Sequence, residues 1–199
     1  MDGEHSTIEE EFLLRRKQGE TEIFCAHAVR RARQSMKSAI ETMKTRRSIR
    51  TYKPGTVERA VIEEIVDCAR LAPTAMNDQP WEFVVITDKK ELARIPTLLG
   101  HAEYVANAAF AVLVLGREAN STVEDCCAAA ENLLLAAEAH GLGACWVAGA
   151  PQPYAPAVVK AFGAPENLKL IAIVSVGIPG EAPQVEKRLL SEVLHWERF

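Results

Sequence analysis

Motifs of several common enzyme classes are missing from this sequence of 199 residues. It contains no Gly-Lys pair, which excludes a Walker A nucleotide-binding loop, and it has neither an HExxH nor a GxSxG motif. No two cysteines have the CxxC spacing and the five histidines are scattered, so we expect no metal site. The nearest approach to a dinucleotide-binding fingerprint, at residues 141–146, follows a predicted helix rather than a strand, which argues against a Rossmann site.

Long apolar stretches and a secretory signal are also lacking. No stretch approaches the roughly 20 apolar residues that span a bilayer, so we expect no membrane protein. Residues 1–11 are acidic, unlike a signal peptide, and the five cysteines are odd in number, so we predict reduced thiols and a cytoplasmic location. An apolar fraction of 48% and a charged fraction of 25% are typical of globular proteins and exclude wholesale disorder.

The net charge is slightly negative (23 − 27 = −4), which does not suggest a nucleic-acid-binding protein. Positive charge is nevertheless concentrated in residues 30–53, where nine basic residues accompany one acidic residue and the remainder of the chain sums to −12. A local basic cluster on an acidic protein favours a specific anionic ligand, although a solvated helix face would have the same composition.

The pattern of charge and hydropathy divides the chain into two parts. Residues 1–35 form a charged N-terminal extension of unknown role, which we predict to be partly helical because Thr7 and Glu10 can form a capping box. In residues 36–199, helical periodicities and buried apolar runs have uneven connections, which favours an α+β sandwich over a regular parallel βαβ fold. Residues 123–140 predict a helix buried on most sides. A strand at 170–176, closed by Gly177, should precede an extended C-terminal arm.

An extended segment after the first short helix of this region offers an anion site. In a strand-like conformation Arg46, Ser48 and Arg50 point to one side, with Arg47 and Ile49 opposite. Two guanidinium groups and a hydroxyl on one face suit the phosphate and polar groups of a single ligand, whereas a solvated turn is the alternative.

A second polar segment, residues 73–80, connects a predicted helix to a predicted strand. Its two prolines restrict the backbone, and the side-chain amides of Asn77 and Gln79 each offer a donor and an acceptor. This combination matches a flat heterocycle with mixed hydrogen-bonding edges, whereas a plain helix-to-strand connection is the alternative.

Together these motifs resemble the FMN-dependent nitroreductase family over residues 36–199. The resemblance is carried by RRSIR at 46–50, APTAMNDQPW at 72–81, ENLLLAA at 131–137, HGLGACW at 140–146, VGIP at 176–179, Arg188 and EVLHW at 192–196. It implies a three-layer α+β sandwich, whose central sheet is mixed but mostly antiparallel and is flanked by helices. It also implies a homodimer that exchanges its C-terminal arms and has FMN bound at the subunit interface.

The resemblance also implies which residues bind the cofactor. Arg46 and Ser48 would hold the phosphate end with Arg47 close by, and Arg188 together with Lys187 would reach the phosphate. Arg50 would sit near the N1/O2 edge of the flavin, and Pro73, Thr74 and Ala75 would line the ring or ribityl chain. Asn77 would bond the pyrimidine edge with Gln79 supporting its loop, and Ala148, Gly149 and Ala150 would place backbone groups by N5.

The implied activity is a ping-pong oxidoreduction, in which NAD(P)H reduces FMN and is replaced by a nitroaromatic, quinone or similar small-molecule acceptor. No side chain need act as a covalent nucleophile, so we nominate no catalytic residue beyond those that hold the cofactor. Substrate choice should depend on variable segments such as 98–107. Alternatives are another reaction on the same fold (reductive dehalogenation or dehydrogenation) and a non-enzymatic flavin-binding sensor. A third is a phosphate- or nucleic-acid-binding module on residues 30–53, which the net charge of −12 on the rest of the chain opposes.

Overall fold

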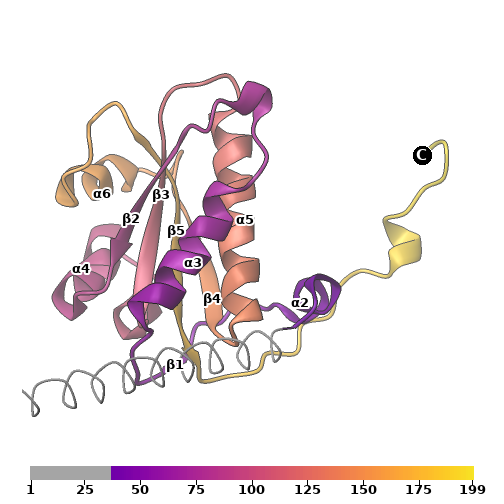
Figure 1. Cartoon of the computed structure of the whole chain (residues 1–199), viewed down its shortest axis with the longest axis horizontal. Coiled ribbons are helices and arrows are strands. Elements are labelled where there is room, and N and C mark those ends of the chain that lie inside the picture. The colour runs from indigo at the N-terminus through magenta and orange to yellow at the C-terminus, as the bar shows by residue number, and fades with distance from the viewer. Residues whose placement is uncertain (1–36) are drawn as a thin grey trace, which may run out of the picture. The chain divides into compact units, whose positions relative to one another are not determined.

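The computed structural model of the protein describes residues 37–199, so the predicted N-terminal extension and its expected helix lie outside the described residues. In the described part, helices flank a five-stranded sheet (Figure 1). The strands are β1 (Tyr52–Lys53), β2 (Trp81–Ile86), β3 (Phe110–Gly116), β4 (Gly143–Ala148) and β5 (Lys169–Pro179). The helices are α2 (Ala39–Thr45), α3 (Arg59–Arg70), α4 (Lys89–Leu99), α5 (Thr122–Ala139) and α6 (Ala155–Ala161), with short 3₁₀ turns η1 (Ala75–Asn77), η2 (Glu103–Asn107) and η3 (Leu190–Glu192).

The long strand β5 organises the sheet because it pairs with three other strands. It is antiparallel to β1, β3 and β4, and β2 continues the sheet beyond β3. Val174 lies opposite Val112 on one side and Trp146 on the other. All pairings between the named strands are antiparallel, and Ser48 adds an isolated parallel bridge to Ala144 outside them. The prediction of a mostly antiparallel sheet is confirmed.

The predicted end of the last strand at Gly177 is wrong, because β5 continues to Pro179. A Cβ atom at position 177 would lie 2.9 Å from Cδ1 of Tyr52 and 3.0 Å from the backbone nitrogen of Ala109. The glycine therefore allows β1 and the start of β3 to approach β5 closely, and it does not break the strand.

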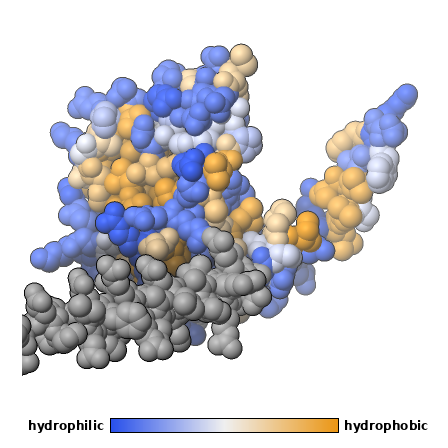
Figure 2. Space-filling model, viewed as in Figure 1, coloured by the Kyte–Doolittle hydropathy of each residue, from blue (hydrophilic) through white to orange (hydrophobic). Residues whose placement is uncertain are grey.

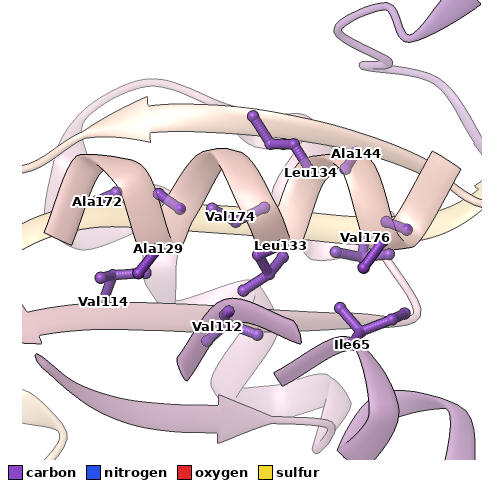
Figure 3. Close-up of a cluster of buried hydrophobic side chains, with 14 of the residues drawn as sticks. Ile65, Val112, Val114, Ala129, Leu133, Leu134, Ala144, Ala172, Val174 and Val176 are labelled. Atoms are coloured by element: carbon purple, nitrogen blue, oxygen red, sulfur yellow. The ribbon is translucent and has the colours of Figure 1, made fainter. Parts of the chain in front are cut away.

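Alternate residues of the central strands point into two separate hydrophobic clusters. On one face, α5 lies along the sheet, and Ala129 and Leu133 approach Val112, Val114 and Val174 (Figure 3). Helix α3 completes that layer by packing on α5. The other face is covered by α4, η2 and α6. The predicted three-layer sandwich is thus confirmed, and α5 is the helix that was expected to be buried on most sides.

Residues 180–199 follow β5 and extend away from the sheet (Figure 1). Their side chains are almost all exposed, and hydrophobic side chains gather on the segment (Figure 2). These include Leu189, Leu190, Trp196 and Phe199. Within residues 37–199, no helix has the length and apolar character needed to cross a membrane.

Candidate functional site

The segment that carries the first predicted ligand contacts runs from the end of α2 to β1. The guanidinium of Arg47 donates to the carbonyl oxygens of Lys44 and Arg46 (2.9 and 2.8 Å), which caps the end of α2. Beyond it, the Ile49 amide donates to the carbonyl oxygen of Ala144 (2.9 Å) and the Ile49 side chain is buried. This anchoring leaves the neighbouring Arg50 side chain exposed, as the predicted alternation requires.

Arg50 lines a cavity of about 370 Å³ together with Ala148, at the far end of β4. The two residues are almost one hundred positions apart, and they meet because β4 and the 46–50 segment lie side by side. The other lining residues are mostly aromatic or polar: His101, Ala102, Tyr104, Trp146, Val147, Gln152 and Tyr154. The His101 and Tyr154 rings stand at a tilt with their centroids 5.4 Å apart.

Sequence reasoning did not single out the aromatic wall of this cavity. His101 and Tyr104 do lie in the 98–107 segment, which we expect to govern substrate choice. The aromatic side chain of Tyr104 in that segment is the feature of the sequence that could have indicated the cavity wall. Trp146 and Tyr154 lie on the strand and at the start of α6, where they could equally have been core residues.

The cavity combines the permanent positive charge of Arg50 with the neutral hydroxyl groups of Tyr104 and Tyr154. The Tyr104 hydroxyl lies 3.3 Å from Sγ of Cys145. Burial raises the pKa of Tyr104 well above its usual range, Cys145 acts in the same direction, and the positive charge of Arg50 opposes them. Tyr104 therefore stays protonated at neutral pH, and Arg50 supplies the positive charge. Such a lining suits a planar ring on which negative charge develops.

The Ala148–Ala150 segment is held tightly against β5. Gly149 and Ala150 donate their amides to the carbonyl oxygens of Ile171 (2.9 Å) and Leu170 (2.5 Å). A Cβ atom at position 149 would lie 2.3 Å from the Leu170 oxygen, so glycine is required there. The Tyr154 hydroxyl donates to the Ala148 carbonyl (2.6 Å). Ala148 lines the cavity, whereas the amides of Gly149 and Ala150 hold the end of β4 against β5.

The loop at residues 73–80 adopts a strained conformation. Met76, Asn77 and Gln79 have φ angles of 53°, 61° and 45°, in the left-handed region that non-glycine residues rarely adopt. The Asn77 and Gln79 side chains are exposed, and the Gln79 amide donates to the Asn77 carbonyl (3.2 Å). Pro73 is exposed as well, and Thr74 is half-buried.

This loop is anchored from the buried core. Oδ1 of Asp125, in the first turn of α5, accepts the Ala75 amide (3.1 Å), and Arg117 donates to the Asp78 carbonyl (2.5 Å). Asp125 is buried, and its Oδ2 has no hydrogen-bond partner among the described residues. These contacts hold the strained backbone in place.

None of the loop residues 73–80 lines the cavity of its own chain. The loop is fixed at Asp125, whereas the end of α2 contacts the opposite end of α5, where Thr45 donates to Glu138 (2.8 Å). Thirteen residues of helix separate these two anchors, about 20 Å along the axis. Arg46 lies between them and pairs with Glu131 (3.6 Å).

The predicted phosphate ligands of the C-terminal arm also lie apart from the cavity. Arg188 donates to the Glu192 carbonyl (2.7 Å) and pairs with the carboxylate of the same residue, and Lys187 is exposed. One chain therefore brings Arg50 and Ala148 together, with Ser48 bridged to β4 nearby. Neither the loop nor the arm lines the cavity of that chain.

The structure is thus an α+β sandwich with a cavity at the end of β4, lined by Arg50 and by aromatic side chains. Comparison with known families specifies this class further. The model of the Nitroreductase family matches residues 43–121 and 98–178. The chain therefore belongs to the nitroreductase family, and the resemblance inferred from its motifs is confirmed.

Individual relatives agree over most of the chain. A protein of Archaeoglobus fulgidus, provisionally named NADH dehydrogenase/NAD(P)H nitroreductase, is 32% identical over 174 residues, which are 82% of this chain and all of the relative. A crystal structure from Bacteroides thetaiotaomicron, with the same provisional name, is 31% identical with a TM-score of 0.77 and covers 82% of this chain and 99% of its own. The FMN-dependent nitroreductase of Clostridium difficile is 27% identical with a TM-score of 0.75 (80% and 99% covered).

Proposed function

We propose that this protein is an NAD(P)H-dependent flavin oxidoreductase that uses FMN to reduce a nitroaromatic, quinone or similar acceptor. The observation that carries the proposal is the cavity shared by Arg50 and Ala148, two distant positions that the family motif assigns to the flavin ring. The family membership and the names of the relatives support the same class of enzyme.

The residues of the cavity fit the ring of FMN. Tyr104, Trp146 and Tyr154 offer flat apolar surfaces with polar tips, and Arg50 supplies a charged hydrogen-bond donor. A hydrogen bond to a charged group contributes about 1.5–3 kcal/mol, so Arg50 would stabilise the negative charge that a reduced flavin carries near N1. When bound, FMN supplies the acceptance and return of hydride, and the protein holds and tunes it. Arg46 and Ser48 would hold its phosphate end, with Arg47 close by.

We propose further that a second copy of the chain completes the site. Asn77 and Gln79 on the loop, and Lys187 and Arg188 on the arm, lie away from the cavity of their own chain, so a partner would have to deliver them to the same ligand. The arm also exposes large apolar side chains such as Leu190 and Trp196. Burying a side chain of this size is worth about 1.5–3 kcal/mol, which favours exchange of the arms between two subunits.

In this arrangement NAD(P)H and the acceptor would occupy the same cavity in turn. The 98–107 segment, through His101 and Tyr104, would contact either of them above the ring. Sharing one cavity leads to ping-pong kinetics, which appear as parallel lines in double-reciprocal plots at several acceptor concentrations. A cytoplasmic location, as expected for an enzyme that uses NAD(P)H, remains a prediction.

A visible spectrum followed by anaerobic reduction tests the proposal. The purified protein, as isolated or after addition of FMN, should show flavin absorbance that NADH or NADPH bleaches and that a nitroaromatic or quinone restores. A protein that stays colourless with FMN would contradict the proposal altogether. Bound flavin that neither nucleotide bleaches would instead favour the sensor or another reaction on the same fold.

A further inference from the structure

We infer that Glu181 is a positioning residue of the flavin site, which holds Arg50 against the cavity and sets the direction of the C-terminal arm. The inference rests on the proposed function. Its basis is a pair of hydrogen bonds: Oε1 of Glu181 accepts the backbone amide of Arg50 (2.5 Å) and that of Thr51 (2.9 Å). Glu181 itself does not line the cavity.

The contact joins the backbone of Arg50 to the first residues of the C-terminal arm. The Gly180 amide donates to the Thr51 carbonyl (2.8 Å), directly beyond the pairing of β1 with β5 at Tyr52 and Pro179. A Cβ atom at Gly180 would lie 3.0 Å from that carbonyl oxygen, so glycine eases the approach. Residues 180–181, the root of the arm, are therefore joined to residues 50–51, whose first member reaches into the cavity.

The carboxylate suits this role because it is ionised. The two backbone amides, chiefly that of Arg50, lower the pKa of Glu181 below its usual range. A carboxylate that accepts two consecutive amides makes a stronger clamp than a neutral acceptor would. By this contact a single side chain sets both the backbone of Arg50 and the start of the segment that carries Lys187 and Arg188.

A positioning role and simple electrostatics predict opposite results. Glu181 is an acid beside a site for an anionic ligand, so removing its charge alone should tighten FMN binding and stabilise the reduced, anionic ring. If Glu181 instead holds Arg50 and the arm in place, its removal weakens FMN binding and makes the flavin reduction potential more negative. The sign of each change therefore separates the two roles.

The test compares Glu181→Ala, Glu181→Gln and the wild type as full-length proteins. Glu186→Ala, which removes an exposed acid on the same arm, is the matched control. FMN affinity is measured by flavin fluorescence titration at fixed ionic strength, and the reduction potential at saturating FMN. We expect at least fivefold weaker binding and a more negative potential for Glu181→Ala. Glu181→Gln keeps an oxygen acceptor but loses the charge, so its affinity and potential should lie between those of wild type and Glu181→Ala. Glu186→Ala should stay within about twofold of wild type.

Binding by Glu181→Ala as tight as that of wild type, or a potential that is unchanged or more positive, would overturn the inference. So would a Gln variant as weak as the Ala variant. Thermal melting without FMN checks that each variant folds. If Glu181→Ala does not melt cooperatively, Glu181→Asp replaces it, because it keeps the charge but shortens the reach, and the same weakening is expected. A wild-type protein that binds no FMN would overturn the proposed function and this inference together, whereas equal binding by wild type and variants would overturn the inference alone.

Discussion

Replacing Gly149 with alanine tests the close approach of β4 to the central strand at the edge of the cavity. The new Cβ atom would lie 2.3 Å from the Leu170 oxygen and 2.6 Å from the Ile171 carbonyl carbon. Both neighbours are backbone atoms of β5 and cannot rotate away. The turn must therefore move off β5, which breaks the hydrogen bond from Gly149 to Ile171.

The expected cost follows from these contacts. Overpacking costs about 1–3 kcal/mol and a lost backbone hydrogen bond roughly 1 kcal/mol, so Gly149→Ala should destabilise the fold by about 2–4 kcal/mol. For a chain of this length the melting temperature should fall by roughly 4–16 °C. Because Ala148 moves with the turn, FMN affinity should fall as well.

Gly163→Ala is the matched control. Gly163 has a φ of +68° with open space around it, and it does not line the cavity. Its replacement should cost about 1–2 kcal/mol through backbone strain alone and leave FMN binding unchanged. Circular dichroism melting without FMN and fluorescence titration with FMN measure the two effects. Wild-type melting and wild-type affinity for Gly149→Ala would refute the reasoning about this turn.

Three further predictions concern the core, a thiol and the arm. Leu133→Ala removes a fully buried side chain between α5 and the sheet and should cost about 2–5 kcal/mol in urea unfolding; a loss below about 1 kcal/mol would contradict the packing. Burial raises the pKa of Cys126 to about 12, so its thiol should resist iodoacetamide at mildly alkaline pH until the protein unfolds, as peptide mass mapping would show. Arg188→Ala should weaken FMN retention with an unchanged melting temperature, because Arg188 is exposed within its own chain; equal affinity would remove its assigned role.

Local patterns in the sequence predicted most of the secondary structure. The apolar residues of 123–140 indicated a buried helix, and α5 lies at the centre of the larger core cluster. The strand end predicted at Gly177 was wrong for a physical reason. A glycine that permits another backbone to approach closely cannot be distinguished in a sequence from a glycine that ends a strand. Tyr104 and Tyr154 were missed for a related reason, because nothing local distinguishes an aromatic residue of a cavity wall from one of the core.

The order of elements, the alternation in residues 46–50 and the family motifs were determined by the sequence alone, because each depends on residues close together in the chain. Only the tertiary structure decided that Arg50 and Ala148 share a cavity and that Glu181 holds the backbone of Arg50. It also decided that the loop carrying Asn77 is anchored to Asp125, in the first turn of α5. These neighbours are separated by 50 to 131 positions in the chain, and pairing of β5 with β1 and β4 and packing of α5 bring them together. No local pattern encodes such pairings, which arise when the whole sheet buries its two faces.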